Sequence, residues 1–240
     1  MFAGITASIP KPEPVIIDPY WDSVVMLAGF EGADAATAIV DEGPQGRTLT
    51  AYGNAQIDTG IALVGSSSLL LDGTGDYVRC AYGTGLTFVD GDFTLECLVR
   101  FPSTKSVNVL FSKRPTSNVS EFWVYINSMS ELNMQIFGSA TARLSLITNY
   151  AFNIEQTYHI AAVKSGNECY LFVNGVLNGQ GTISGGAVAT NTQDLYIGRS
   201  PDNTTRDAIA TMDEVRVTKA ARYTANFTVP SFPLPRSKYT

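Results

Sequence analysis

The sequence predicts an all-β protein built as a two-sheet antiparallel jelly-roll sandwich, and three observations lead to that fold class. Apolar residues recur with period two from residue 93 to 101, while Thr94, Glu96 and Arg100 take the opposite face. Asn174-Gly175 stands between two apolar runs, which is the strongest short signal for a hairpin turn because both residues tolerate positive φ. The remaining apolar runs are short, and Gly, Ser, Asn and Asp clusters separate them at intervals of about 8 to 15 residues.

The individual elements follow from the same pattern. The predicted strands are residues 24–27, 68–71, 77–81, 93–101, 107–112, 122–127, 132–137, 158–164, 170–173, 176–177, 195–198 and 213–218. The one helical candidate is residues 219–223, a single turn at most. Hydrophobic residues make up 45% of the chain, which is enough for a core, and charged residues only 16%, which leaves the surface to Thr, Ser, Asn and Gly.

The domain organisation has three predicted parts. Residues 1–20 form an extended, proline-rich N-terminal arm, because alternating prolines fix φ and favour polyproline II geometry. Residues 21–235 form the sandwich, and residues 236–240 form a C-terminal tail. The arm carries residues that suit a partner surface: Phe2, Ile5, Ile9, Pro10, Pro12 and Pro14. A disordered terminus is the alternative.

Charge and cysteine content exclude several functions. The net charge of −6 gives no attraction to nucleic acid or to anionic lipid, and no apolar run approaches the roughly 20 residues that insertion into a membrane needs. Residues 1–14 lack the apolar region of a secretory signal. Cys80, Cys97 and Cys169 are widely spaced and odd in number, which indicates buried small side chains rather than disulfides or zinc ligands.

Four ordered motifs carry a family resemblance. They are residues 65–78 (GSSSLLLDGTGDYV), 92–99 (DFTLECLV), 158–164 with 170–175 (YHIAAVK and YLFVNG), and 195–199 with 212–217 (LYIGR and MDEVRV). In this order they resemble the laminin-G-like branch of the concanavalin-A-like jelly-roll family, with Leu98 where tryptophan is usual. The resemblance covers about residues 21–235.

Two further segments resemble tailed-phage structural proteins, namely residues 21–27 with 54–57 and the closing stretch 215–228. That resemblance implies a non-enzymatic virion protein, as a decoration, fibre or tail component, made in the host cytoplasm and displayed on the particle. Its expected partners are other virion proteins, bound through the arm, and further copies of itself. The alternative is a carbohydrate-binding module that attaches to a host surface glycan.

A calcium site is a second expectation, because hard cations take several oxygen ligands from loop carboxylates. The resemblance implies an early loop acid and the acid of the last strand, which here are Asp41 and Asp213, with Asp72 and Glu31 as companions. This sequence departs from the family pattern at residues 42–44, which are Glu-Gly-Pro where relatives more often have Ser-Ser or Ser-Gly. Asp before Gly also caps turns by bonding its own backbone, so turn chemistry is the alternative.

Sugar binding needs exposed aromatic side chains on a sheet face. Trp123 and Tyr125 alternate on one strand face and are candidates for a stacking platform. The alternative places both in the core, with Phe122 and Val124 outside or covered by a neighbouring subunit.

The sequence predicts no enzyme, and glycoside hydrolysis is the least favoured alternative. His159 is the only histidine and is expected to be a hydrogen-bonded strand residue. Hydrolysis of a glycosidic bond needs a pair of carboxylates, and the E-x-D-x-E triplet typical of hydrolases on this fold is missing. Glu96 and Glu214 are expected to be solvated strand positions.

Overall fold

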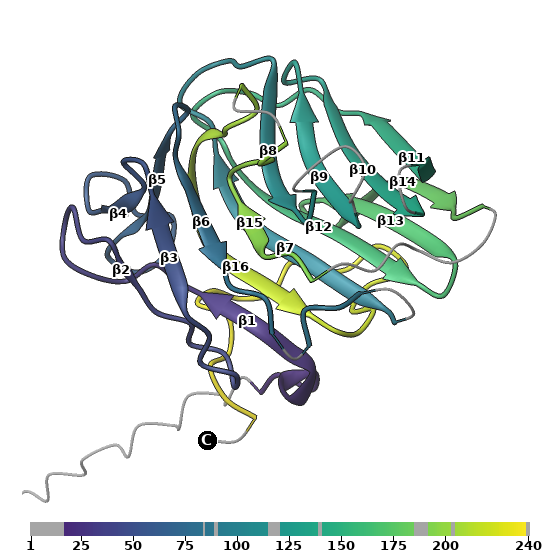
Figure 1. Ribbon diagram of the computed structural model, residues 1–240, viewed down its shortest axis with the longest axis horizontal. Coiled ribbons are helices and arrows are strands. Elements are labelled where there is room, and N and C mark those ends of the chain that lie inside the picture. Colours follow the sequence, from purple (N-terminus) through teal and green to yellow (C-terminus); the bar gives the residue numbers. More distant parts are fainter. Residues whose placement is uncertain are drawn as a thin grey trace, which may run out of the picture.

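The computed structural model describes residues 17–83, 85–88, 91–114, 121–138, 141–184, 192–202 and 205–238, without the side chains of 141 and 142. Two antiparallel eight-stranded sheets lie face to face (Figure 1). Sheet A has the order β14-β13-β12-β7-β16-β5-β4, with β1 also paired to β16, and sheet B has the order β11-β10-β9-β8-β15-β6-β3-β2. The predicted all-β jelly-roll sandwich is therefore confirmed.

The strands of sheet A are β1 (Val24–Ala28), β4 (Gln56–Asp58), β5 (Ser68–Asp72), β7 (Phe93–Arg100), β12 (Thr157–Ser165), β13 (Glu168–Val173), β14 (Val176–Thr182) and β16 (Ile209–Thr218). Those of sheet B are β2 (Ala38–Ile39), β3 (Leu49–Tyr52), β6 (Tyr77–Cys80), β8 (Val107–Ser112), β9 (Phe122–Asn127), β10 (Glu131–Gly138), β11 (Thr141–Asn149) and β15 (Leu195–Ile197). A single 3₁₀ turn, Trp21–Ser23, precedes β1. No helix of the described residues has the length and apolar character to cross a bilayer.

The core lies between the sheets, and the period-two pattern of β7 explains its position. The side chains of Phe93, Leu95, Cys97 and Val99 are buried in the main cluster, as predicted. The hairpin between β13 and β14 is also confirmed, since Asn174 and Gly175 have φ of 51° and 77°. A side chain at residue 175 would lie 2.2 Å from the carbonyl oxygen of Phe227, so glycine is required there for space as well.

A C-terminal segment, residues 219–238, returns along the outer face of sheet A and explains two wrong predictions. Residues 219–223 form no helical turn, because their backbone groups bond to other parts of the chain: the Lys219 amide donates to Ser23 and the Ala220 carbonyl accepts from Thr94. Glu96 and Glu214 are not solvated but buried, with exposures of 0% and 1%. The covering segment desolvates both carboxylates.

The chain ends of the described region also pack on the sandwich. Asp18 is 2% exposed, although residues 1–20 are assigned to the arm on sequence. Arg236, in the assigned tail, lies 2.6 Å from Glu214. The arm residues expected to bind a partner lie outside the described residues, namely Phe2, Ile5, Ile9, Pro10, Pro12 and Pro14.

Candidate functional site

The outer face of sheet A is closed by a buried charge network. Glu96 accepts from Arg216 Nε at 2.9 Å and from the Tyr223 hydroxyl at 3.0 Å, and lies 3.2 Å from His159 Nε2. Burial alone would raise the pKa of Glu96, but the attraction of Arg216 and the His159 bond outweigh it and hold that pKa near 2. His159 is thus a buried, hydrogen-bonded strand residue, as predicted. The carboxylate of Glu96 is therefore engaged within the protein rather than available to a ligand.

On the outer face of sheet B, several of the described side chains are partly exposed, among them Arg79, Tyr196 and Gln135. The register of seven consecutive strands lines up one row of directly paired, outward residues. In strand order from β3 to β11, that row is Thr50, Arg79, Tyr196, Ser112, Trp123, Gln135 and Ser145. Because neighbouring strands lie about 4.8 Å apart, the row crosses nearly the whole width of the sheet.

Three tyrosines, Tyr52, Tyr77 and Tyr196, form a cluster at the β3–β6–β15 end of this face, here called the tyrosine cluster. The rings of Tyr52 and Tyr77 are stacked, with centroids 4.6 Å apart and an interplanar angle of 3°, and Tyr196 lies 5.7 Å from Tyr77. All three side chains are partly exposed. Burial raises the pKa of Tyr77 and of Tyr196, so both hydroxyls stay protonated at neutral pH and can donate hydrogen bonds.

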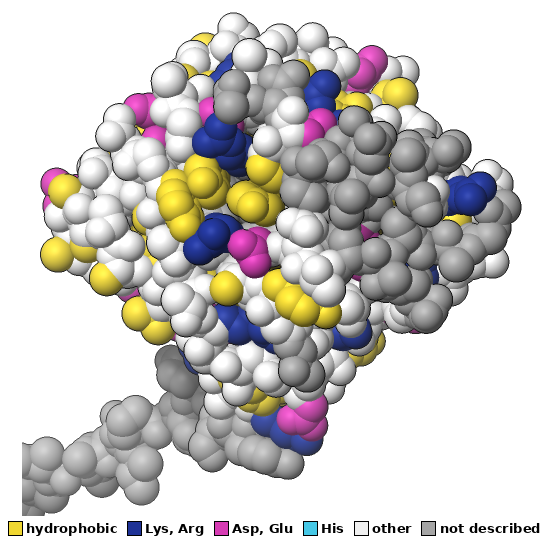
Figure 2. Space-filling view, viewed as in Figure 1, with side chains coloured by type: hydrophobic (Ala, Val, Ile, Leu, Met, Phe, Trp, Pro, Cys, Tyr) yellow, Lys and Arg dark blue, Asp and Glu magenta, His cyan; other side chains and the backbone are white. Residues whose placement is uncertain are grey.

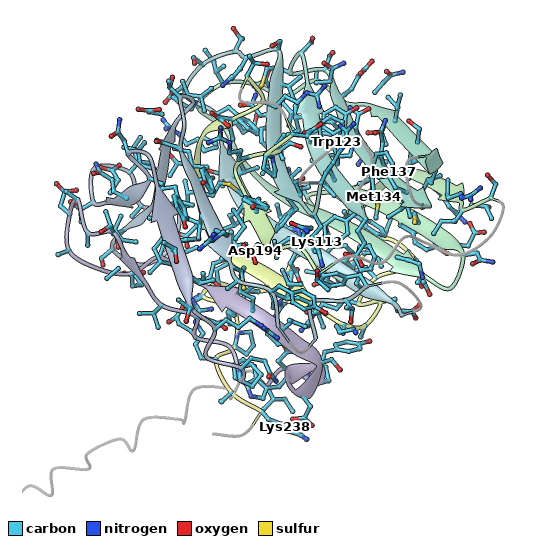
Figure 3. All side chains as sticks on the ribbon, viewed as in Figure 1. Lys113, Trp123, Met134, Phe137, Asp194 and Lys238 are labelled. Atoms are coloured by element: carbon cyan, nitrogen blue, oxygen red, sulfur yellow. The ribbon has the colours of Figure 1, made fainter. Side chains whose placement is uncertain are left out.

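Two ion pairs border the tyrosine cluster. The Arg79 guanidinium lies 5.0 Å above the Tyr52 ring and 3.5 Å from Asp194, and that of Arg199 lies 4.9 Å above the Tyr77 ring and 3.2 Å from Asp207. Figure 2 shows hydrophobic side chains gathered near the middle of this view and bordered by basic and acidic ones, where Figure 3 labels Asp194. The cluster therefore offers aromatic rings together with paired donors and acceptors.

The predicted platform, Trp123 and Tyr125, lies on the same outer face, and Phe122 and Val124 point into the core. The two rings stack at 3.9 Å, but Trp123 is only 5% exposed. Its Nε1 donates to Gln135 at 2.6 Å. Trp123 packs with Phe137 of the neighbouring strand, both labelled in Figure 3.

Two guanidiniums cover the Trp123 ring. Arg114 lies 4.8 Å and Arg206 5.0 Å from its centroid. Trp123 is thus a covered support rather than an open stacking surface, and Tyr125 is the partly exposed member of the pair.

The carboxylates expected to bind calcium are separately engaged. Asp41 accepts the amides of Leu27, Gly43 and Arg47 at 2.7–2.9 Å, and Asp72 accepts the Thr74 amide at 2.7 Å. Asp213 accepts the Val64 and Glu214 amides and the Ser68 hydroxyl at 2.7–3.0 Å, and Glu31 bonds Ser66. Within the described ranges, no three His, Cys, Asp or Glu side chains are grouped to hold a metal. The structure therefore does not bring Asp41, Asp72 and Asp213 together, and turn and loop bonding occupies each of them.

The tyrosine cluster was not among the sequence predictions, although a signal for it exists. Tyr77 and Tyr196 alternate with Val78, Leu195 and Ile197, which are buried. The alternation places both tyrosines on the outer face. The alternation alone does not give the strand register, which pairs Tyr196 of β15 with Arg79 of β6.

Comparisons with known proteins agree with this architecture. The sequence profile of the family described as the concanavalin A-like lectin/glucanases superfamily (Laminin_G_3) matches residues 72–226. No curated protein sequence matches the chain.

Similar solved structures are binding domains of toxins. The binding domain of Paraclostridial Mosquitocidal Protein 1 superposes with a TM-score of 0.70 at 15% identity, over 85% of this chain and 50% of that one. The receptor binding domain of botulinum neurotoxin C/D mosaic serotype gives 0.66 at 11%, over 85% and 49%. The botulinum neurotoxin serotype D ligand binding domain, solved in complex with N-acetylneuraminic acid, gives 0.64 at 10%, over 85% and 49%. The present chain thus spans about half the length of these structures, and at such identities the likeness concerns the fold.

Proposed function

Since the chain belongs to the concanavalin A-like lectin/glucanase superfamily, we propose that it is a carbohydrate-binding module that takes its glycan on the outer face of sheet B. The observation that carries the proposal is the tyrosine cluster with its two bordering ion pairs. Toxin binding domains share the fold, which supports binding rather than catalysis as the role.

The chemistry of the cluster suits a sugar ring. A sugar presents an apolar C–H face and a rim of hydroxyls, and aromatic rings with nearby polar groups match both surfaces. Tyr77 and Tyr196 supply the ring surface, while Arg79 and Asp194 supply donors and acceptors for hydroxyls. Since the two bordering pairs each combine one positive and one negative charge, the cluster carries no net charge.

Glycoside hydrolysis fits this face less well. Hydrolysis needs one carboxylic acid to protonate the leaving oxygen and a second carboxylate across the bond. On the described part of the outer face, Asp194, Asp202 and Asp207 are each paired with arginine at 3.2–3.5 Å. Each of these carboxylates already has a guanidinium as its partner, which supports a binding role rather than acid–base catalysis.

The test is glycan binding by single-site variants. Tyr77→Ala and Tyr196→Ala should each weaken binding at least about tenfold, as expected for an aromatic anchor at a contact centre. Tyr170→Ala is the matched control, because Tyr170 is a partly buried tyrosine on the outer face of sheet A. Glycan-array binding followed by titration calorimetry gives the affinities. Equal binding by Tyr77→Ala, Tyr196→Ala and the control would refute the site.

We further propose that the module belongs to a tailed-phage particle, where the arm anchors it to other virion proteins and to sister copies. The support is the resemblance of residues 21–27 and 215–228 to such proteins and the apolar, proline-rich composition of residues 1–16. Glycan binding on an anchored module would serve attachment to a host surface.

A further inference from the structure

Beside the tyrosine cluster lies a second group of charged residues that the proposed function has not used. Arg114 and Arg206 both bond the same oxygen, Asp202 Oδ2, at 3.2 Å. The other oxygen of Asp202 accepts the Ser200 hydroxyl. Two positive charges therefore share one negative charge, and that carboxylate already has three donors.

Within the ion-paired group itself, two arginines outnumber one aspartate. Residues 115–120 and 203–204, the chain neighbours of Arg114 and Asp202, contain no charged residue. Glu131 acts on nearby Tyr125 and accepts a hydrogen bond from Asn127 at 2.7 Å, and no ion pair among the described residues joins it to either arginine. This contrasts with the tyrosine cluster, where each arginine has its own aspartate.

Arg114 also has an unused donor. A guanidinium carries five N–H groups in a fixed fork that matches two acceptor oxygens of one anion. Arg114 Nε is buried without a hydrogen-bond partner. Burial lowers the pKa of Arg114, Asp202 opposes this effect, and the neighbouring positive charge of Arg206 adds to it. Arg206 is accessible, with 28% of its side chain exposed.

The place of this group relative to the tyrosine cluster is set by strand register. Tyr196 pairs with Ser112, and Ser112 pairs with Trp123, whose ring lies under both guanidiniums. Two strand spacings, about 10 Å, therefore separate the tyrosine cluster from the arginine pair. The Ser112 hydroxyl accepts the Arg114 amide at 3.1 Å and holds the strand end in place.

We propose that Arg114 and Arg206 form an anion subsite, so that the glycan bound on this face is acidic and places a carboxylate or sulfate group at the arginine pair while a neighbouring sugar ring lies on the tyrosine cluster. This inference rests on the proposed carbohydrate binding and narrows it to acidic glycans. Trp123 then serves as the rigid support on which the two guanidiniums rest, by cation–π contact.

The experiment compares acidic glycans with their neutral counterparts. An array should carry neutral, carboxylated and sulfated glycans, and the best acidic ligands are titrated beside their carboxyl-reduced and desulfated forms. Neutralisation should weaken binding at least about tenfold, as expected when charge-assisted hydrogen bonds are lost. The treatment that has this effect identifies the group as carboxylate or sulfate. Binding should also fall as salt rises.

Variants assign the effect to the arginine pair. Arg206→Gln should bring the acidic-to-neutral affinity ratio close to one, and Asp202→Asn should raise that ratio because both guanidiniums lose their competing carboxylate. Arg100→Gln is the control, since it removes a cation from β7 in the other sheet. Thermal melts check that each variant is folded, and Arg114→Gln serves as a second test of the pair.

The outcomes separate this inference from the proposed function. Equal affinity for acidic and neutral glycans, with Tyr77→Ala still defective, would overturn the anion subsite and leave carbohydrate binding standing. A preference for acidic glycans that survives Arg206→Gln and Arg114→Gln would also overturn it. No binding to any glycan on the array would overturn both.

Discussion

Arg216 on the last strand lies 3.0 Å from Asp18, a residue 198 positions earlier in the chain, and both side chains are at most 2% exposed. Arg222 bonds the same carboxylate through two nitrogens at 2.7 and 2.9 Å. Burial would raise the pKa of Asp18, but the bonds and charges of Arg222 and Arg216 lower it. This carboxylate joins the start of the sandwich to the segment that covers sheet A.

Asp18→Asn should lower the free energy of unfolding by about 3 kcal/mol, because removal of one partner leaves buried guanidinium charge uncompensated. Urea denaturation at pH 7 measures the change. Asp22→Asn is the control: Asp22 is 70% exposed in its ion pair with Lys238, and an exposed pair contributes about 0–1 kcal/mol. Similar effects of the two substitutions would contradict the role of Asp18.

Truncation gives an independent test of where the sandwich begins. Deletion of residues 1–14 should leave the melting temperature nearly unchanged and abolish assembly with virion partners or sister copies. Deletion of residues 1–20 also removes Asp18 and should lower the melting temperature markedly. A truncated protein lacking 1–14 that still assembles at the wild-type level would refute the anchor role.

Asp213 should make stability fall as pH rises from 5 to 8. Burial raises its pKa to about 7 from the ordinary 3.8, so the folded protein holds this proton more tightly than the unfolded chain does. The stabilisation is complete below pH 4 and is lost as pH rises through 7, by about 2–3 kcal/mol between pH 5 and 8. Asp213→Asn should remove this part of the slope in urea titrations. An identical slope in the variant would contradict the assignment.

Glu96 should have the opposite effect at acid pH. With its pKa held near 2, below the ordinary 4.5, its carboxylate stabilises the fold above pH 4.5 and ceases to do so as pH falls towards 2. Glu96→Gln should therefore be less stable at pH 7 and lose less further stability on acidification. Circular dichroism melts from pH 7 to 2 measure both. A variant that parallels the wild type throughout would count against the network.

Chelation tests the calcium expectation. A site at a hundredfold excess of calcium over Kd would add about 2.7 kcal/mol, or several degrees of melting temperature. Because Asp41 and Asp213 each accept three hydrogen bonds from this chain, we expect EDTA to leave the melting temperature unchanged. A fall of several degrees would instead support a metal at these residues.

Local patterns were sufficient for most of the fold. The alternation in β7 and the Asn174-Gly175 turn depend on neighbours in sequence, and both are as predicted. β11 was missed because Ile147, an apolar residue, points outward and is 55% exposed, which obscures the alternation of its edge strand. β3 was not predicted because it has only four residues and only Leu49 is buried, so it shows no apolar alternation.

The sites depend on contacts between distant segments. Glu96 looks solvated in its strand because its partner Arg216 lies 120 residues away. Tyr77 and Tyr196 meet because β15 pairs with β6, and Arg114 and Asp202 meet across separate loops. No local pattern contains these pairings, so the sequence alone could not show which aromatic residues remain accessible on the outer face.

The segment that covers sheet A has a consequence for valency. Phe227 and Tyr223 stack 3.6 Å apart over Phe172 and close one of the two broad faces of the sandwich. Under the proposed function, the outer face of sheet B is then the one glycan-binding face of each copy, so two simultaneous contacts with a surface glycan layer require two copies. When copies are linked, binding by the first copy raises the effective concentration of the second copy at the surface. The overall affinity then increases through avidity, without any new contact. If the proposed site binds a glycan, strong attachment to a glycan-coated surface is then expected of an array of copies rather than of a single copy.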